Sequence, residues 1–161
     1  MKRKTFDLRT WPRVSEHRQT VSQVADMVFV DFAALHVVRP LDVPALAPDS
    51  GALDSGVVRV LDHGFRWVRA HQTGVSSALS HAVEGGVAPG SAMTAQLTEL
   101  GAPVQVYVDL HGGEGIQPDG LPWHDDLYLD VIGGPDPQQP WRVVATEIID
   151  GDELAEAVAL G

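Results

Sequence analysis

Residues 107–131 read YVDLHGGEGIQPDGLPWHDDLYLDV. Two short apolar runs, YVDL and LYLDV, each hold a Tyr two residues before an Asp, and a stretch rich in Gly and Pro separates them. Both runs have the composition of β-strands, yet Asp is disfavoured in the interior of a strand. A carboxylate that occurs twice in the same setting therefore indicates a structural or functional requirement for it.

The first run predicts a strand with two chemically different faces. Side chains alternate across a strand, so Tyr107 and Asp109 share one face while Val106, Val108 and Leu110 share the other. We expect the apolar face to pack against the core and the other face to present a phenol and a carboxylate.

The second run repeats this arrangement, because Asp126, Tyr128 and Asp130 alternate with Leu127, Leu129 and Val131. If the two strands are neighbours, Asp109 and Asp130 come close enough to share a cation. Asp126 and Asp130 are about 13 Å apart along a straight strand at ~3.3 Å per residue. They can bind one ion only if the chain bends near HDDL; otherwise Asp126 serves a second ion or a water molecule.

The polar faces have two interpretations. They can simply meet water, as the outer face of an antiparallel strand does. Alternatively, they line a site for a hard cation, and clustered carboxylates in a chain without Cys suit Mg²⁺, Mn²⁺ or Ca²⁺ better than zinc. His111 and His124 flank the same region and are either exposed loop residues or further ligands.

The charge distribution divides the chain. Residues 1–80 hold 10 Lys and Arg against 8 Asp and Glu, whereas residues 81–161 hold Arg142 alone against 14 acids, giving a net charge of -11 for the chain. An acidic half can be a solvated surface, or it can hold a cation while basic residues from the N-terminal half meet an anionic ligand. The acidic balance argues against nucleic acid as the partner.

Other function classes are bounded by composition. The absence of Cys excludes disulfides, thiolate catalysis and zinc–thiolate sites. No apolar run reaches the roughly 18 residues of a membrane helix, and the basic start MKRKTFDLRTW leads into no signal-peptide core. We expect a cytoplasmic protein that does not contact a membrane.

Hydrophobic patterning predicts a mainly β chain. Seven to nine short strands at near-regular spacing, followed by one terminal helix, favour an antiparallel β-barrel, with a sandwich as the related possibility. No break divides the chain, so residues 1–161 are expected to form one domain. The strands predicted along the chain are TFDLRTW near the start, one or two in 25–38, then 57–62, 63–70, a hairpin of 94–100 with 103–110, then 127–132 and 141–149.

Two further stretches are predicted with other structures. Residues 43–56 have the composition of a loop, and residues 75–86 are compatible with a helix that ends at Gly85. The final stretch DGDELAEAVALG begins with acids and continues with Ala and Leu, which is typical of a helix.

The start of that helix, IIDGDEL, also has two interpretations. Asp150 followed by Glu153 fits a capping box, in which Asp150 is the N-cap. Alternatively Asp150, Asp152 or Glu153 turns toward the carboxylates of the strands as a ligand or general base. The sequence does not separate the two.

Three segments in order, VQVYVDL, HDDLYLDV and IIDGDELAEAVALG, resemble the FomD-like barrel family. Its members include nucleoside tri- and diphosphate phosphatases and a hydrolase of cytidylyl phosphonates. The resemblance covers residues 103–161 and implies a barrel in which two strands and an acidic helix start hold divalent ions, Mg²⁺ or Mn²⁺, against substrate phosphates; Ca²⁺ can occupy such a site in crystals. The residues it places at the metal site or beside it are Asp109, Asp126, Asp130, Asp150, Asp152 and Glu153.

The resemblance extends less closely to the N-terminus. A Lys and an Arg-x-Trp in the family correspond to KRKTFDLRTW, which implies that Lys4 and Arg9 contact phosphate and that Trp11 neighbours the site. Leu8 stands where the family has a His, and Tyr128 stands where some members have a third acid. Tyr107 either hydrogen-bonds a phosphate, stacks near the base or forms part of the barrel wall.

The expected function is metal-assisted hydrolysis of phosphoanhydride bonds in nucleoside di- or triphosphates, with a small-molecule nucleotide as the substrate. Asp130 or Asp126 would orient or deprotonate the attacking water. One alternative is a barrel that binds RNA or nucleotides without turnover. Another is a degenerate barrel in which Tyr128 has cost the site its metal.

Overall fold

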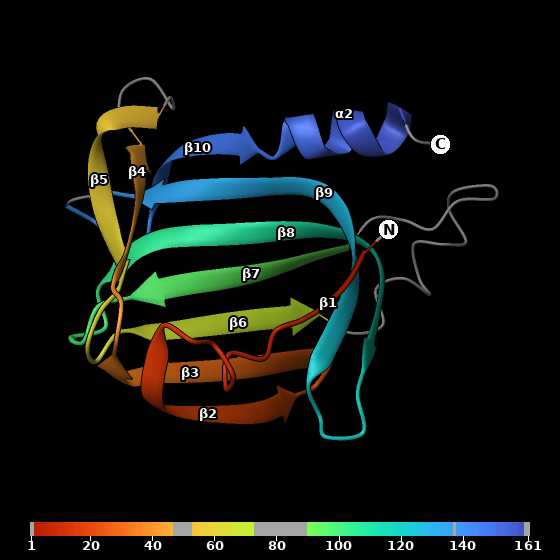
Figure 1. Cartoon of the computed structure of the whole chain (residues 1–161), viewed down its shortest axis with the longest axis horizontal. Helices are drawn as coiled ribbons and strands as arrows, with labels where there is room; N and C mark the ends of the chain where they lie inside the picture. Colours follow the sequence, from red (N-terminus) through yellow and green to blue (C-terminus); the bar gives the residue numbers. More distant parts are fainter. Residues whose placement is uncertain (1, 47–52, 73–89, 137, 160–161) are drawn as a thin grey trace.

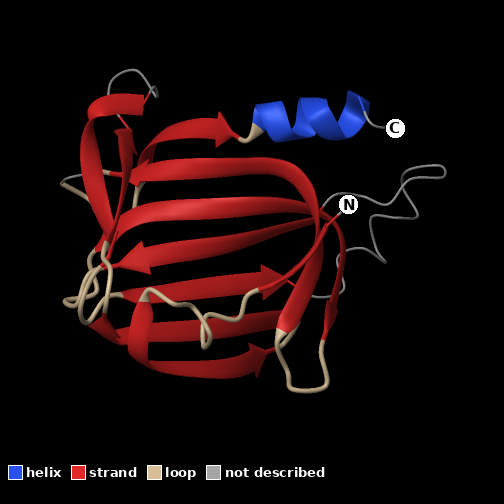
Figure 2. Cartoon of the chain, viewed as in Figure 1, coloured by secondary structure: helices blue, strands red, loops and turns tan. Residues whose placement is uncertain are grey.

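The two Tyr-x-Asp runs lie on adjacent long strands, β8 (Pro103–Ile116) and β9 (Pro122–Pro135), which pair antiparallel. The computed structural model of the chain describes residues 2–46, 53–72, 90–136 and 138–159. In this part of the chain, antiparallel strands curl into a half-barrel and one short helix follows the last strand (Figures 1 and 2). The predicted fold class is therefore confirmed.

Eight strands form one sheet in the order β1-β9-β8-β7-β6-β3-β2, and β10 pairs with the other half of β9. β4 and β5 form a separate two-stranded ribbon at one end of the sheet (Figure 1). The remaining elements are β1 (Lys2–Thr5), β2 (Val14–Val24), β3 (Met27–Val37), β4 (Leu41–Leu46), β5 (Leu53–Leu61), β6 (Arg66–Gln72), β7 (Gly90–Leu97), β10 (Val143–Ile149) and α2 (Gly151–Ala159). In the described residues no helix has the length and apolar composition needed to cross a membrane.

Strands β8 and β9 are longer than predicted, at 14 residues each. The Gly-rich stretch HGGEGI, expected as part of a loop, continues β8 because its glycines leave room for side chains of β9. A Cβ added at Gly115 would lie 2.6 Å from the Trp123 ring, and one added at Gly113 would lie 3.0 Å from Oδ2 of Asp125. Glycine in a strand often marks such a close approach.

Most other predicted elements are present. The hairpin of β7 and β8, the strand after residue 140 and the terminal helix are confirmed. The strand predicted over TFDLRTW, residues 5–11, was wrong except at Thr5, because the first strand is Lys2–Thr5 and residues 6–11 form turns and irregular structure. The predicted helix at 75–86 lies outside the described residues.

Two further predictions were wrong. Residues 43–46 and 53–56, predicted as parts of a loop, lie in strands, because a two-stranded ribbon tolerates Pro44. The strand predicted over 57–62 forms the rest of β5 and is confirmed. β2 had no predicted element, since its sequence VSEHRQTVSQV is mostly polar and most of its side chains are exposed at the edge of the sheet.

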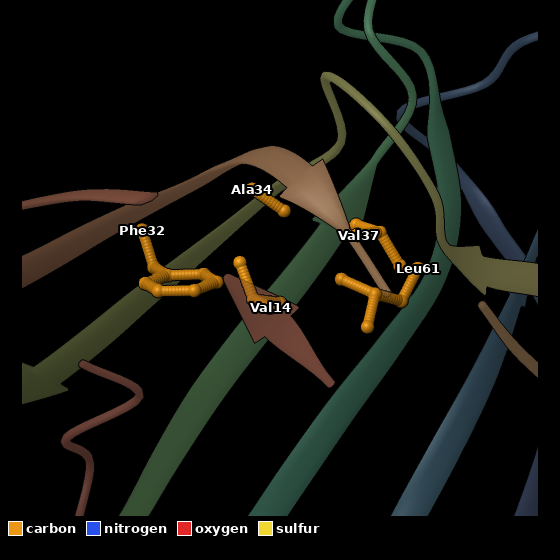
Figure 3. Close-up of a cluster of buried hydrophobic side chains, with 5 residues drawn as sticks. All are labelled: Val14, Phe32, Ala34, Val37 and Leu61. Atoms are coloured by element: carbon orange, nitrogen blue, oxygen red, sulfur yellow. The ribbon is translucent and has the colours of Figure 1, made fainter. Parts of the chain in front are cut away.

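A cluster of apolar side chains stabilises the end of the half-barrel near β2 and β3. Val14, Phe32, Ala34, Val37 and Leu61 are buried together, as Figure 3 shows. Burying each of the larger side chains contributes about 2 kcal/mol. Leu8, Trp11, Leu41 and Trp67 pack against this cluster and extend it toward the middle of the sheet.

The inner face of the sheet, defined as the face that carries Trp67, Arg69 and His71 on β6, changes from apolar to polar across the strands. Two rows of register partners show this change. One row contains Val30, Arg69, Thr94 and Tyr107, and the next contains Val28, His71, Ala92, Asp109 and Asp130.

The inner face of β8 is the reverse of the prediction, because its polar side chains are the buried ones. Gln105, Asp109 and His111 are buried, whereas Val106 and Val108 on the other face are only partly buried. Sequence alternation assigned the residues to the correct faces but assigned the wrong face to the interior. Buried polar side chains require partners inside the protein, and the site described next supplies many of them.

Candidate functional site

A pocket of about 330 Å³ opens on the inner face and is apolar on one side and polar on the other. Its apolar wall includes Phe6, which follows β1, together with Leu41 on β4, Val60 on β5 and Trp67 on β6. The polar wall is formed by Lys4, Arg69, Thr94, Gln96, Gln105, Tyr107, Asp109 and His124. A concave apolar site with a few convergent polar groups is typical of a small-molecule site.

Arg69 and Asp109 form a buried ion pair at the floor of this pocket. Nη1 of Arg69 lies 2.5 Å from Oδ2 of Asp109 and also donates a hydrogen bond to Thr94, while its Nη2 lies 3.3 Å from Nδ1 of His124. Burial opposes ionisation of Asp109, but His124 and Arg69 more than offset it and hold the pKa of Asp109 well below its usual range. The carboxylate is therefore ionised at neutral pH.

Lys4 brings the N-terminal strand into contact with the acids of β9. Its Nζ lies 2.6 Å from Oδ2 of Asp126, and the side chains of the two residues are 36% and 2% exposed. Burial opposes the charge on Lys4, but its bond to Asp126 and the charges of Asp130 and Asp109 raise its pKa. One ammonium thus faces three carboxylates.

Asp130 is the carboxylate with the least compensation. Tyr107 donates a hydrogen bond to its Oδ2, while its Oδ1 is buried and has no hydrogen-bond partner among the described residues. Burial is the main cause that raises the pKa of Asp130 to about 6; Asp109 and Asp126 raise it further, whereas Tyr107 and Lys4 oppose the rise. Burial and the bond to Asp130 also raise the pKa of Tyr107, which keeps the phenol neutral as a donor.

An irregularity in β9 brings Asp126 and Asp130 to the same cluster. Asp109 pairs in register with Asp130 and His111 with Asp126, so one intervening residue on β8 faces three on β9. Tyr128 has φ +60°, and its backbone N–H donates to Oδ1 of Asp126. Tyr128 therefore occupies the left-handed conformation that the bulge requires, and the bend that a shared site needs is present.

A second polar group lies beside the first, farther along β6 and β8. His71 and His111 stack with their ring centroids 5.2 Å apart and their planes at 5°, and Oε2 of Glu114 lies 3.4 Å and 3.8 Å from their Nε2 atoms. Burial and the charge of Arg69 lower the pKa of His71 to about 3, and burial followed by His124 lowers that of His111. Both rings are neutral imidazoles at physiological pH.

The histidines expected near the first site are thus buried rather than exposed, with His111 at 1% and His124 at 3% exposure. His124 links the two groups. Because Arg69 can only donate, Nδ1 of His124 accepts, and the proton of its ring lies on Nε2, 3.7 Å from Oδ1 of Asp109.

Two predicted substrate-binding residues lie at the pocket and two do not. Lys4 and Tyr107 line it. Arg9 is exposed and pairs with Asp7 and, at 3.4 Å, with Asp119. Trp11 packs on Trp67, with ring centroids 5.2 Å apart, and so supports a pocket residue from behind.

Two of the three acids at the start of α2 are exposed to solvent, unlike the buried strand carboxylates. Asp152 and Glu153 are exposed, whereas Asp150 is partly buried and its charge acts on Tyr107. Asp150 directly precedes α2, the position predicted for the N-cap, and it has φ +63° in place of the extended backbone typical of an N-cap. The capping box stays a prediction.

Arg69, His71 and Glu114 are the residues of this region that sequence reasoning did not identify as functional. In HGFRWVRAHQ, Arg69 and His71 lie on one face of the strand. A strand that exposes its polar residues to solvent has the same alternating pattern. The available signal was that Arg69 is the last basic residue before the acidic half, which is consistent with its role as the partner of Asp109.

The carboxylate cluster, defined as Asp109, Asp126 and Asp130, has the chemistry that a hard divalent ion prefers, with oxygen donors and an unpartnered Oδ1 on Asp130. Its oxygens, however, are turned toward Arg69, Lys4 and Tyr107. Among the described residues the one group whose ligand atoms all lie within 4.8 Å of one another is His71, His111 and Glu114. Shared coordination by the three aspartates therefore requires side-chain rotation toward a common point.

Comparison with models of known protein families found no match, and comparison with curated proteins found none either.

Proposed function

We propose that the protein is a divalent-metal-dependent hydrolase of phosphoanhydride bonds in nucleoside di- or triphosphates. The observation that carries the proposal is the convergence of three buried aspartates on the ammonium of Lys4 at a pocket that also contains Arg69. Three carboxylates facing two cations leave an excess negative charge. The carboxylate cluster would hold a Mg²⁺ or Mn²⁺ ion, which would supply positive charge to offset the negative charge of the phosphates in the transition state.

The pocket offers different groups to the two ends of a nucleotide. Trp67 and Phe6 present aromatic surface on which a base can stack, while Lys4 and Thr94 lie on the polar wall. Lys4 is the partly exposed cation of the site. Its ammonium can therefore turn from Asp126 to a phosphate oxygen once another cation pairs with Asp126. Arg69 is almost fully buried and keeps Asp109 ionised and in position.

Asp130 is the residue we assign as general base. With a pKa of about 6 it is ionised at neutral pH and is a better proton acceptor than an ordinary aspartate. Water attacks a phosphorus atom, its proton passes to Asp130, and the bond from that phosphorus to the bridging oxygen breaks. The products are the shortened nucleotide and phosphate, and Tyr107 holds the Asp130 carboxylate in place throughout.

Nucleotide binding without turnover is the second candidate. Two observations favour it. Each aspartate already has a donor from the protein, and the oxygens of the three aspartates do not form one of the groups of ligand atoms that lie within 4.8 Å of one another among the described residues. In that case the aromatic wall and Lys4 bind the ligand and the carboxylates only position Lys4 and Arg69.

Phosphate release from a panel of nucleoside di- and triphosphates, with Mg²⁺, Mn²⁺ or EDTA, tests the proposal. We expect metal-dependent release that Asp130→Ala abolishes, whereas Asp119→Asn, an exposed aspartate at the turn after β8, leaves it unchanged. Nucleotide binding with no release in any metal would favour the second candidate. Release that is equal in EDTA, or equal in Asp130→Ala, would contradict the first.

A further inference from the structure

A group of three potential metal ligands lies beside the pocket, and the proposed hydrolysis makes no use of it. Nε2 of His71, Nε2 of His111 and Oε2 of Glu114 face one another from β6 and from the far end of β8. One ligand atom from each residue lies within 4.8 Å of the others. This spacing permits a common bond to one ion, because Zn–N and Zn–O bonds are about 2.0–2.2 Å long.

Both rings are buried, and each has a nitrogen atom without a hydrogen-bond partner in the part of the chain that the structure describes. His71 is 0% exposed and has neither Nδ1 nor Nε2 satisfied; His111 is 1% exposed and has Nε2 unsatisfied. A buried polar atom without a partner destabilises the folded state, so three of them in adjacent rings require an explanation. An ion bound between the rings would satisfy the two Nε2 atoms that point toward Glu114.

The surroundings of His111 fix its ring in the orientation a ligand needs. The ring hydrogen-bonds the backbone of Ser91, and Nε2 is the nitrogen left over. Its other side lies against Gly90, where an added Cβ would be 2.3 Å from Cε1 of the ring. Hydrogen bonds of this kind, from the second nitrogen of a ligating histidine to a backbone group, orient the ligand in known metal sites.

His124 is adjacent, with its ring centroid 5.5 Å from that of His111, but it is not available as a ligand. Its Nδ1 accepts from Arg69, and its Nε2 carries the proton that faces Asp109. The positive charge of Arg69 disfavours a cation at this position. The two negative charges of Glu114 and Asp109 offset the effect of Arg69. The local balance therefore permits a divalent ion.

We propose that His71, His111 and Glu114 form a binding site for a divalent transition-metal ion of the zinc type, distinct from the carboxylate cluster. Two imidazoles and one carboxylate are the ligands of several zinc and iron sites and leave at least one coordination position for water or a substrate atom. The site selects against Mg²⁺, which prefers oxygen ligands. This inference is independent of the proposed function, since it concerns ion binding and not turnover.

Metal affinity of the untagged, EDTA-treated protein tests this site directly. Equilibrium dialysis against Zn²⁺ should give one tightly bound ion per chain, and Co²⁺ should give a visible absorption spectrum with nitrogen and oxygen ligands. Glu114→Gln keeps the size of the side chain and should weaken Zn²⁺ binding by about tenfold or more. His111→Asn should abolish it.

Two controls separate the site from other causes. The chain has seven histidines, and His36→Asn alters a pair of exposed residues, His36 and Ser15, so Zn²⁺ binding should be unchanged. Far-UV circular dichroism verifies that each variant folds. Zn²⁺ should raise the Tm of the wild type and of His36→Asn, raise that of Glu114→Gln less, and leave that of His111→Asn unchanged. The proposal is overturned if the wild type binds neither Zn²⁺ nor Co²⁺, or if Glu114→Gln and His111→Asn bind Zn²⁺ as tightly as the wild type.

Discussion

The two halves of the inner face of the sheet are built from opposite chemistry. Around β3 it carries Val28, Val30, Phe32 and Ala34, all buried, and these side chains require only close packing. From β6 to β9 it carries mostly charged and polar side chains, which are buried to the same degree and depend on specific partners. Apolar burial stabilises a fold without any ligand, whereas buried charge is costly and is kept where chemistry needs it.

Removal of one charge from the polar half should have the largest effect on stability. Arg69→Ala leaves Asp109 buried without its guanidinium, and we expect the free energy of unfolding to fall by about 4 kcal/mol. Arg66→Ala, on the same strand, breaks a half-exposed pair with Asp31 and should cost less than about 1 kcal/mol. Urea denaturation of both variants measures the difference.

A double variant sharpens this prediction. Arg69→Met with Asp109→Leu removes both charges, and it should recover most of the stability lost in Arg69→Ala. Equal losses in Arg69→Ala and Arg66→Ala would show that the pair is not the feature that distinguishes this half.

Leu61→Ala tests the apolar half in the same way. Leu61 is 0% exposed in the cluster with Val14 and Phe32, so the substitution should lower the free energy of unfolding by about 3 kcal/mol. Val57→Ala, at an exposed position of the same strand, is the control and should have almost no effect. Phosphate release per folded molecule should stay near that of the wild type, and its loss would mean that the two halves are not separable.

Asp130→Asn should make the protein more stable and inactive at once. Because its pKa is raised to about 6 in the folded protein, Asp130 binds a proton there up to a higher pH than in the unfolded chain. Its contribution to stability is therefore present below about pH 4 and is lost as pH rises through about 6. The Asn side chain stays neutral, so the variant should gain on the order of 2 kcal/mol at pH 8 and almost nothing at pH 4.

Thermal or urea unfolding of Asp130→Asn at the two pH values measures this gain, with Asp119→Asn as a control that shows no pH-dependent gain. If Asp130→Asn and the wild type are equally stable at pH 8, then ionisation of Asp130 does not destabilise the folded protein. That result would remove the argument for its role as a base.

The smallest effect is predicted for Arg9, which the resemblance described in the sequence analysis implied as a phosphate contact. Lys4→Met should raise the KM for a nucleotide by about tenfold, the equivalent of 1.4 kcal/mol. Arg9→Met should change KM less than twofold, because Arg9 pairs with Asp7 and Asp119 outside the pocket. A large increase in KM for Arg9→Met would show that the N-terminal segment moves toward the pocket on binding.

The sequence predicted the strands that carry this site better than it predicted which face of those strands is buried. Strand alternation put Asp109 and Asp130 on the polar faces of two strands, and their approach was expected only if these strands were neighbours; the structure pairs the two residues in register. The same alternation could not show which face is buried, because that depends on how the whole sheet curls. The contacts of Arg69 and Glu114 are made between strands far apart in the chain and have no local signature.

Tyr128 illustrates the same limit at one residue. Its position between two acids suggested a lost ligand, whereas its φ of +60° identifies it as the bulge residue that brings Asp126 and Asp130 together. A non-glycine residue in this conformation is uncommon and leaves no mark in a strand-like sequence.

Nucleotide affinity as a function of Mg²⁺ tests most directly whether the carboxylate cluster seats an ion against phosphates. Isothermal titration with a non-hydrolysable nucleoside triphosphate should show binding in Mg²⁺ and none in EDTA, and Asp126→Asn should lose the Mg²⁺-dependent binding while Glu114→Gln keeps it. Binding of equal affinity in Mg²⁺ and EDTA, or retention of the Mg²⁺ effect in Asp126→Asn, would contradict the account.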